Sequence, residues 1–211
     1  LRDPVDRLAS AWFYRGHNPK ENAFRNRSYA KRDPKSDPRW TWQEYVQLPD
    51  YANVQTRMLG TMGRVHAYDW NVVPDSAALA LAKDRLWRLD VVGHTKAVKT
   101  TQLLILRLFG MVPANASVTV NEFMDSLPVA ETKTSGEHER LQTSRAYSAL
   151  KHRFRVDGEL QAEAERVNAF DVELVEEGKR VFCAQVDEAG LLRRGEVRDE
   201  LKAARLCGQL L

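Results

Sequence analysis

The residues best suited to chemistry lie at the start of the sequence, Leu1 to Ser10, where an arginine precedes a predicted helix. Asp3 is a favoured N-cap residue and Pro4 suits the first helical position. A helix N-terminus carries partial positive charge, and an arginine can hold a phosphate through two parallel hydrogen bonds. Arg2 and the hydroxyl of Ser10 could therefore bind a phosphate. Taken alone, the spacing favours the simpler interpretation of a solvated Arg and Ser beside a capped helix.

The same stretch resembles the 3′-phosphate-binding motif of sulfotransferases that use 3′-phosphoadenosine-5′-phosphosulfate (PAPS). The similarity comprises an Arg-Asp-Pro sequence, a second arginine four residues after the aspartate, and a serine eight residues after the first arginine. In that family this arginine and serine hold the 3′-phosphate of the donor. The resemblance gives the same roles to Arg2 and Ser10. The aromatic run Trp12-Phe13-Tyr14 also resembles the family's continuation.

Three further segments resemble the family, in the expected order along the chain. Residues 53–60, Asn-Val-Gln-Thr-Arg-Met-Leu-Gly, resemble a segment of the branch that contains the heparan sulfate and uronyl 2-O-sulfotransferases. Residues 90–95 resemble a strand that ends in Val-Gly-x-Thr, but Lys96 stands where the family usually has Glu, which puts a polar role of that position in doubt. Residues 168–174, Asn-Ala-Phe-Asp-Val-Glu-Leu, resemble the closing helix.

The resemblance implies transfer of a sulfuryl group from PAPS to a hydroxyl of a glycan acceptor, such as a glycosaminoglycan. In the family the 5′-phosphosulfate loop and the catalytic base precede the Arg-Asp-Pro motif, so both would lie before Leu1 and the base is unknown. We therefore expect residues 1–211 to be the C-terminal part of a single sulfotransferase domain, inactive alone. The family's eukaryotic members imply a Golgi lumen location and a membrane anchor upstream of this sequence.

Two other segments contain candidate binding residues. Some family members close a loop over the donor near residues 131–135, where Lys133, Thr134 and Ser135 offer a cation and hydroxyls; an ordinary solvated loop is the alternative. Residues 15–39 carry eight basic and three acidic residues, a net charge of +5 against +3 for the whole chain. By the resemblance, their Arg15, Arg25 and Arg27 would bind an anionic glycan; a solvated, mobile surface is the alternative.

Two other functions remain open on the same residues. A P-loop nucleotide phosphotransferase and a non-catalytic glycan-binding relative are the alternatives to the sulfotransferase. Aromatic residues are too thinly interleaved with the basic ones for a nucleic-acid surface. No cluster of His, Cys or carboxylates has metal-ligand spacing, so no metal is expected. The five histidines are predicted to be surface or structural residues: His17, His66, His94, His138 and His152.

The elements that must position these residues follow from composition and periodicity. Hydrophobic residues make up 43% and charged residues 29%, as in ordinary globular proteins, and no apolar run approaches the roughly 18 residues that span a bilayer. A buried parallel strand is predicted at 89–93. We therefore expect an α/β fold with a P-loop-like parallel sheet, whose first strand and phosphate loop are missing. Helices are predicted within 3–16, 40–60, 75–86, 96–109, 159–186 and 195–206.

Two cysteines, Cys183 and Cys207, are too few for a disulfide scaffold and have no metal-ligand spacing. Two unpaired thiols are favoured over a disulfide bridge. The sequence does not set the redox compartment, the oligomeric state or the position sulfated on the acceptor.

Overall fold

The computed structural model describes residues 1–16, 45–47, 51–61, 73–111 and 157–211, with residues 12–16 through their backbone alone. These residues form helices joined by turns and extended segments, and they contain no β-strand. The elements are α1 (Pro4–Gly16), α4 (Val54–Thr61), α5 (Ser76–Trp87), α6 (Val98–Leu108), α10 (Gly158–Val167), α11 (Ala169–Glu188), the 3₁₀ turn η2 (Leu191–Arg193) and α12 (Gly195–Ala204).

The expected α/β fold with a P-loop-like parallel sheet is therefore wrong for the described part of the chain. The residues of the predicted strand, 89–93, form no regular secondary structure and join no sheet. Its Val92 side chain is buried with side chains of α5 and α11. The side chain of Gln185 takes the place of a neighbouring strand, since its Oε1 accepts from the Val92 N–H (2.8 Å) and its Nε2 donates to the Leu89 carbonyl (2.8 Å). Gln185 thus satisfies two backbone groups of this run without a sheet.

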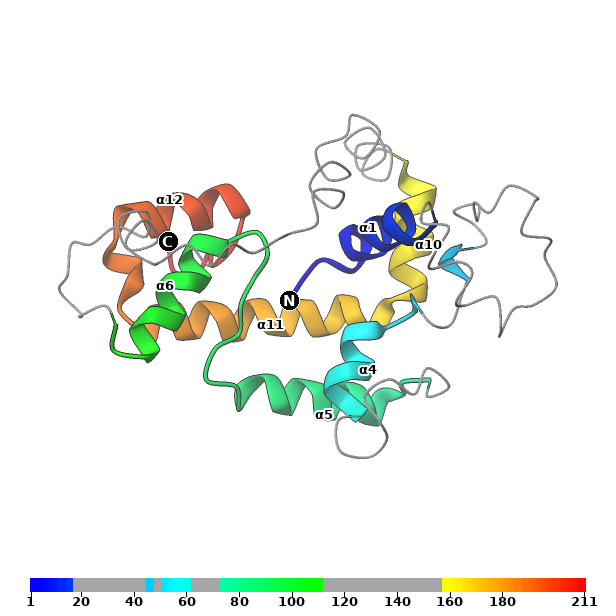
Figure 1. Cartoon of the computed structure of the whole chain (residues 1–211), viewed down its shortest axis with the longest axis horizontal. Helices are drawn as coiled ribbons and strands as arrows, with labels where there is room; N and C mark the ends of the chain where they lie inside the picture. Colours follow the sequence, from blue (N-terminus) through cyan, green and yellow to red (C-terminus); the bar gives the residue numbers. More distant parts are fainter. Residues whose placement is uncertain (17–44, 48–50, 62–72, 112–156) are drawn as a thin grey trace.

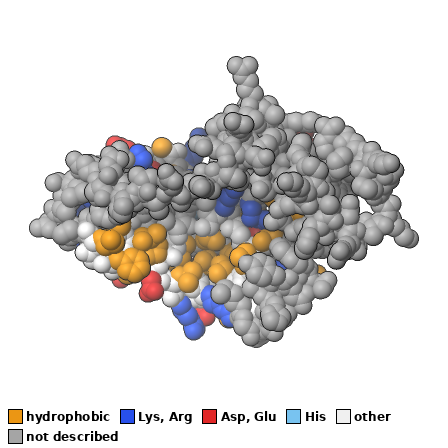
Figure 2. Space-filling view, viewed as in Figure 1, with side chains coloured by type: hydrophobic (Ala, Val, Ile, Leu, Met, Phe, Trp, Pro, Cys, Tyr) orange, Lys and Arg blue, Asp and Glu red, His pale blue; other side chains and the backbone are white. Residues whose placement is uncertain are grey.

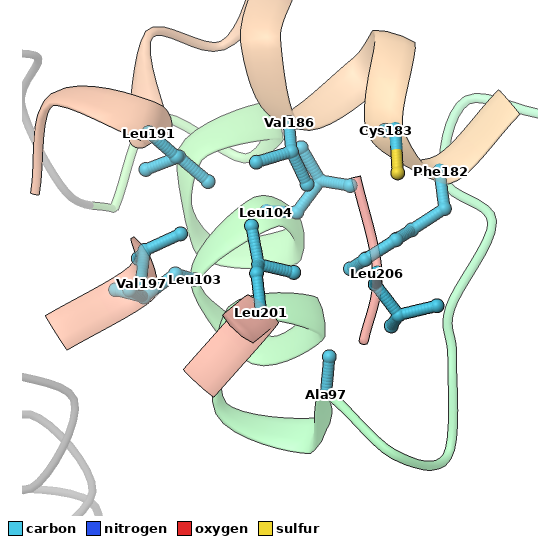
Figure 3. Close-up of a cluster of buried hydrophobic side chains, with 10 residues drawn as sticks. All are labelled: Ala97, Leu103, Leu104, Phe182, Cys183, Val186, Leu191, Val197, Leu201 and Leu206. Atoms are coloured by element: carbon cyan, nitrogen blue, oxygen red, sulfur yellow. The ribbon is translucent and has the colours of Figure 1, made fainter. Parts of the chain in front are cut away.

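Helix α11 is the centre of the fold (Figure 1). Helices α1 and α10 lie along one side of it, α4 and α5 along the other, and α6 and α12 beside its C-terminal half. Buried apolar side chains form three clusters, two of which include residues of α11. In the largest cluster, side chains converge from α6, α11, η2, α12 and the segment after it (Figure 3): Ala97, Leu103, Leu104, Phe182, Cys183, Val186, Leu191, Val197, Leu201 and Leu206.

Local capping signals predict several helix ends correctly. Asp75 caps α5, because its carboxylate accepts from the Ala78 N–H at 2.8 Å. Gly110, at a φ of +66°, follows the end of α6 in the left-handed conformation that glycine adopts without strain. The single helix predicted at 159–186 is wrong, however. Asn168 divides it into α10 and α11, and its side chain bonds other parts of the fold instead of continuing the helix.

The two cysteines are joined in a disulfide, so the prediction of unpaired thiols is wrong. Cys183 lies on α11, and Cys207 follows α12 at a φ of +57°. The left-handed turn after α12 brings the two Cα atoms to 5.4 Å, within the range that a disulfide spans. The bridge therefore ties the C-terminal end of the described fold to its central helix.

Helix α6 is apolar on more than its inner face. Its buried side includes Leu103 and Leu104, while Ile105 and Leu108 are exposed, as is the Phe109 that follows the helix. Figure 2 shows hydrophobic side chains on the surface at this end of the molecule. Among the residues that the structure describes, no helix has the length and apolar character needed to cross a membrane.

Candidate functional site

The start of α1 is built as the sequence predicts. Asp3 caps the helix, since its Oδ1 accepts from the N–H groups of Val5 (3.0 Å) and Asp6 (3.1 Å), and Pro4 occupies the first helical position. Arg7 N donates to the Asp3 carbonyl at 2.8 Å. The first N–H groups of α1 are thus already bonded, and a carboxylate occupies the helix terminus. A phosphate at this place would have to be held by side chains rather than by the helix N-terminus.

The backbone of Arg2 is held on two sides. Gln55 accepts from the Arg2 N–H (3.1 Å) and donates to the Arg2 carbonyl (2.8 Å). The preceding Leu1 pairs with the segment between α5 and α6, donating to the Gly93 carbonyl (2.5 Å) and accepting from the Thr95 N–H (3.1 Å). The backbone around Arg2 is therefore fixed by residues from distant parts of the chain.

Arg7, the second arginine of the motif, makes its side-chain contacts with other parts of the fold. Its Nη2 donates to the Tyr51 carbonyl (2.8 Å) and to Oδ1 of Asn168 (2.9 Å), and lies 3.6 Å from Oδ2 of Asp171. Burial lowers the pKa of Arg7, Asp171 opposes this shift, and the like charges of Arg2 and Arg57 add to it. The guanidinium groups of Arg2 and Arg57 thus lie within electrostatic range of Arg7.

Asp171 holds the first turn of α4. Its side chain is fully buried, and its carboxylate accepts from the N–H groups of Gln55 (3.0 Å) and Thr56 (2.7 Å). Asn53, at a φ of +48°, bonds back from the start of α4, since its Oδ1 accepts from the Asp171 N–H at 3.1 Å. Asn168 joins the same network by accepting from the Asn53 N–H at 3.0 Å. Two segments that resemble the sulfotransferases separately, 53–60 and 168–174, are therefore one interlocked unit.

No local pattern predicts this network. The sequence contains one related signal, which indicates a helix start. Asn168 followed by Asp171 has the spacing of a helix N-cap with an acid in the first turn. That pattern marks the start of α11 correctly, but Asn168 makes no side-chain cap bond to it. Both side chains instead satisfy α4 and Arg7, whose positions depend on contacts between distant parts of the chain.

Ser10 lies on the second turn of α1 and is half-buried. It is six residues beyond Pro4, about 9 Å of helix rise, and one turn beyond Arg7. Arg2 is within electrostatic range of the same Arg7. A phosphate shared by Arg2 and Ser10 would therefore lie along the side of α1, next to the arginine cluster Arg2, Arg7 and Arg57.

The other candidate binding residues are not placed by the structure. Arg15 belongs to the last turn of α1, although its side chain is outside the described residues. Arg25 and Arg27, together with Lys133, Thr134 and Ser135, also lie outside the described residues. Their proposed contacts with a glycan and with the donor remain predictions.

A cleft of about 650 Å³ opens beside the start of α1. Four carboxylates and two cations line it, so its charge is unsuited to phosphates. No group of three or more His, Cys, Asp or Glu side chains among the described residues is arranged to hold a metal ion. The cleft is lined by Asp3, Val5, Asp6, Lys96, Gln161, Glu165, Glu200, Ala203, Ala204 and Arg205.

Comparison with known proteins does not place the chain in a family. No family model, no curated protein and no solved structure matches it. A function for this chain must therefore follow from its own residues.

His94 lies between α5 and α6 and is buried, with 4% of its surface exposed. Its Nδ1 accepts from the Lys96 N–H at 3.2 Å, and its Nε2 has no hydrogen-bond partner among the described residues. Burial, followed by the positive charges of the Leu1 amino group, Lys179 and Lys96, lowers its pKa to about 4, against a small opposing effect of Asp3. His94 is therefore neutral near pH 7, as a structural residue.

We expect this histidine to make the protein sensitive to acid. Its pKa is about 4 in the folded state and 6.5 in the unfolded chain, so the unfolded chain binds the proton first and stability falls as the pH drops from 6.5 to 4. With allowance for solvent screening, the loss from this residue is about 2 kcal/mol. His94→Asn keeps an acceptor for Lys96 and should flatten this part of the pH profile in urea titrations. An equally steep profile in the variant would rule His94 out.

Proposed function

We propose that this chain binds the 3′-phosphate of PAPS and takes part in transfer of the sulfuryl group to a hydroxyl of a glycan. The observation that carries the proposal is the arginine cluster Arg2, Arg7 and Arg57, in which Arg2 and Arg57 lie within electrostatic range of Arg7. Positively charged side chains next to a hydroxyl are what an anionic phosphate requires. The sulfotransferase-like motif assigns that phosphate to a PAPS-type donor.

Within this cluster the three arginines have different tasks. Arg7 and Arg57 are occupied with backbone carbonyls of Tyr51 and Ala52, so they contribute mainly charge. Arg2 and Ser10 are the proposed direct contacts, by a guanidinium fork and a hydroxyl respectively. The N-terminus of α1 would contribute little, because Asp3 occupies its first N–H groups.

When bound, PAPS supplies an activated sulfuryl group. In the transfer, the acceptor oxygen forms a bond to sulfur, the bond from sulfur to the phosphate oxygen breaks, and adenosine 3′,5′-bisphosphate leaves. The acceptor proton passes to a base, to which we assign no residue. Such a reaction depends on positioning and charge stabilisation, and anchoring the 3′-phosphate contributes positioning.

The acceptor side of the proposal is an anionic glycan. Arg15, Arg25 and Arg27 are its proposed contacts, and Lys133, Thr134 and Ser135 are proposed to close on the donor. For a eukaryotic protein, a Golgi lumen location belongs to the same proposal. The disulfide between Cys183 and Cys207 supports it, since disulfides persist in oxidising compartments.

Replacing Arg2 with alanine tests the proposed anchor. The bonds from Gln55 reach the Arg2 backbone, so they survive the substitution that removes the guanidinium. Loss of a hydrogen bond to a charged group should weaken adenosine 3′,5′-bisphosphate binding by about 1.5 to 3 kcal/mol, or roughly 10- to 150-fold. Calorimetry measures this directly.

The matched control is Arg88→Ala. Arg88 is an exposed arginine at the C-terminal end of α5, where it pairs with Asp84 one turn earlier. It should bind the nucleotide as the wild type does. If the two alanine variants were indistinguishable from each other, Arg2 would have no part in binding.

A further inference from the structure

Gln55 makes an unusual pair of contacts with the proposed anchor. Its carboxamide bonds both backbone groups of one residue, accepting from the Arg2 N–H at 3.1 Å and donating to the Arg2 carbonyl at 2.8 Å. A side chain needs a donor and an acceptor at its end to do this, and the carboxamide of Gln provides both. Gln55 therefore fixes the orientation of the peptide groups on either side of Arg2.

Gln55 is itself anchored to the central helix. Its own N–H donates to Oδ2 of Asp171 at 3.0 Å, and Asp171 is fully buried on α11. Asn53 completes the connection by accepting from the Asp171 N–H at 3.1 Å. The position of Arg2 is thus linked through Gln55 and Asp171 to the middle of the fold.

A second contact from α11 restrains the same stretch of backbone. Leu1 lies against Gly178, where an added Cβ would come within 1.8 Å of the Leu1 Cδ1 atom. The side chain before Arg2 therefore occupies the space that the glycine leaves open. Gln55 and Gly178 together hold Leu1 and Arg2 at a defined place relative to α4 and α11.

We infer that Gln55 is a positioning residue, which sets the direction in which the Arg2 guanidinium leaves the backbone and so determines preference for a 3′-phosphorylated nucleotide. The inference rests on the proposed function, in which Arg2 holds that phosphate. A two-bond guanidinium contact depends on angle as well as distance, so rotation of the Arg2 backbone weakens it. Binding that does not involve the 3′-phosphate should be insensitive to Gln55.

The test is Gln55→Met, which keeps the length of the side chain and its helix propensity but removes both bonds. The dissociation constant of adenosine 5′-phosphate divided by that of adenosine 3′,5′-bisphosphate should fall about tenfold. The dissociation constant of adenosine 5′-phosphate itself should not change. Gln55→Ala is a second variant with the same expectation, should the thioether disturb packing. Circular dichroism and thermal unfolding check that each variant is folded.

The chain contains a matched control. Gln185 makes the same kind of clamp on the backbone at Leu89 and Val92, and Gln185→Met removes it without touching Arg2. That variant should keep the wild-type nucleotide preference. A double-mutant cycle adds the decisive readout, because Gln55→Met should have no further effect in an Arg2→Ala background if it acts through Arg2.

The outcomes separate the two claims. If the wild type does not prefer the bisphosphate, the proposed function fails and the role of Gln55 fails with it. If the wild type prefers it and Arg2→Ala does not, but Gln55→Met keeps the preference, the role of Gln55 alone is overturned. An undiminished effect of Gln55→Met in the Arg2→Ala background would also overturn it.

Discussion

Replacing Asp171 with alanine should destabilise the protein by about 3 to 5 kcal/mol. The carboxylate is fully buried and is 3.6 Å from the guanidinium of Arg7, so its removal leaves a largely buried charge without its counterion. It also bonds the N–H groups of Gln55 and Thr56, which would lose their partner at the start of α4. Because both losses occur together, this substitution should cost more than any that removes one of these contacts alone.

Equilibrium unfolding in urea measures the change. Asp187→Ala is the matched control, since Asp187 is an exposed aspartate on the same helix and its loss should change the free energy of unfolding by less than about 0.5 kcal/mol. Asp171→Asn should fall between the two, because an amide oxygen can still accept one backbone bond. A cost below about 1 kcal/mol for Asp171→Ala would show that the network does not support the fold.

Removing the disulfide should have the second-largest effect. Cys183 and Cys207 are 24 residues apart. A bridge that closes a loop of that length lowers the entropy of the unfolded chain and so stabilises the folded protein by about 3 kcal/mol. Replacing both with alanine should therefore lower the midpoint of urea unfolding, as should a reductant added to the wild type. The double alanine variant should not respond to the reductant, which separates the disulfide from general effects of the reagent.

A thiol titration provides the independent check. Oxidised wild-type protein, unfolded in denaturant, should contain no reactive thiol, and the reduced protein should contain two. Two thiols in protein purified without reductant from an oxidising compartment would contradict the bridge.

Local sequence signals are sufficient to predict a helix start when the N-cap residue itself bonds the first N–H groups of the helix. Asp3 and Asp75 each accept from an N–H two or three residues further along, and both helices begin where their capping residue predicts. The end of α6 before Gly110 follows from the same kind of signal. Features whose energy comes from neighbours in sequence can therefore be predicted.

Features that depend on distant residues cannot be predicted in this way. The N-terminus of α4 is bonded by Asp171, 115 residues away, and that of α6 by Glu200, 100 residues away. The apolar run at 89–93 predicts a strand because the sequence contains no sign that Gln185 satisfies its backbone. The two cysteines meet only because a left-handed turn follows α12. Contacts between residues distant in the sequence determine each of these features.

The candidate site also contains features that the sequence indicates and features that it does not. The sequence singles out Arg2 and Ser10, and their roles as phosphate contacts remain predictions. It does not indicate that Arg7 is occupied inside the fold, or that Asp3 takes the N–H groups at the helix terminus. The arginine cluster can be recognised only from the structure, where Arg2 and Arg57 lie within electrostatic range of Arg7.

The central claim is that the arginine cluster holds a nucleotide 3′-phosphate, and one calorimetric comparison tests it most directly. The chain of 211 residues is titrated at low salt with adenosine 3′,5′-bisphosphate and with adenosine 5′-phosphate. We predict that the bisphosphate binds at least about tenfold more tightly, because only it offers the phosphate that Arg2 would bind. The preference should shrink as salt rises, since salt screens charges on partly exposed side chains. Equal affinities for the two nucleotides would contradict the account.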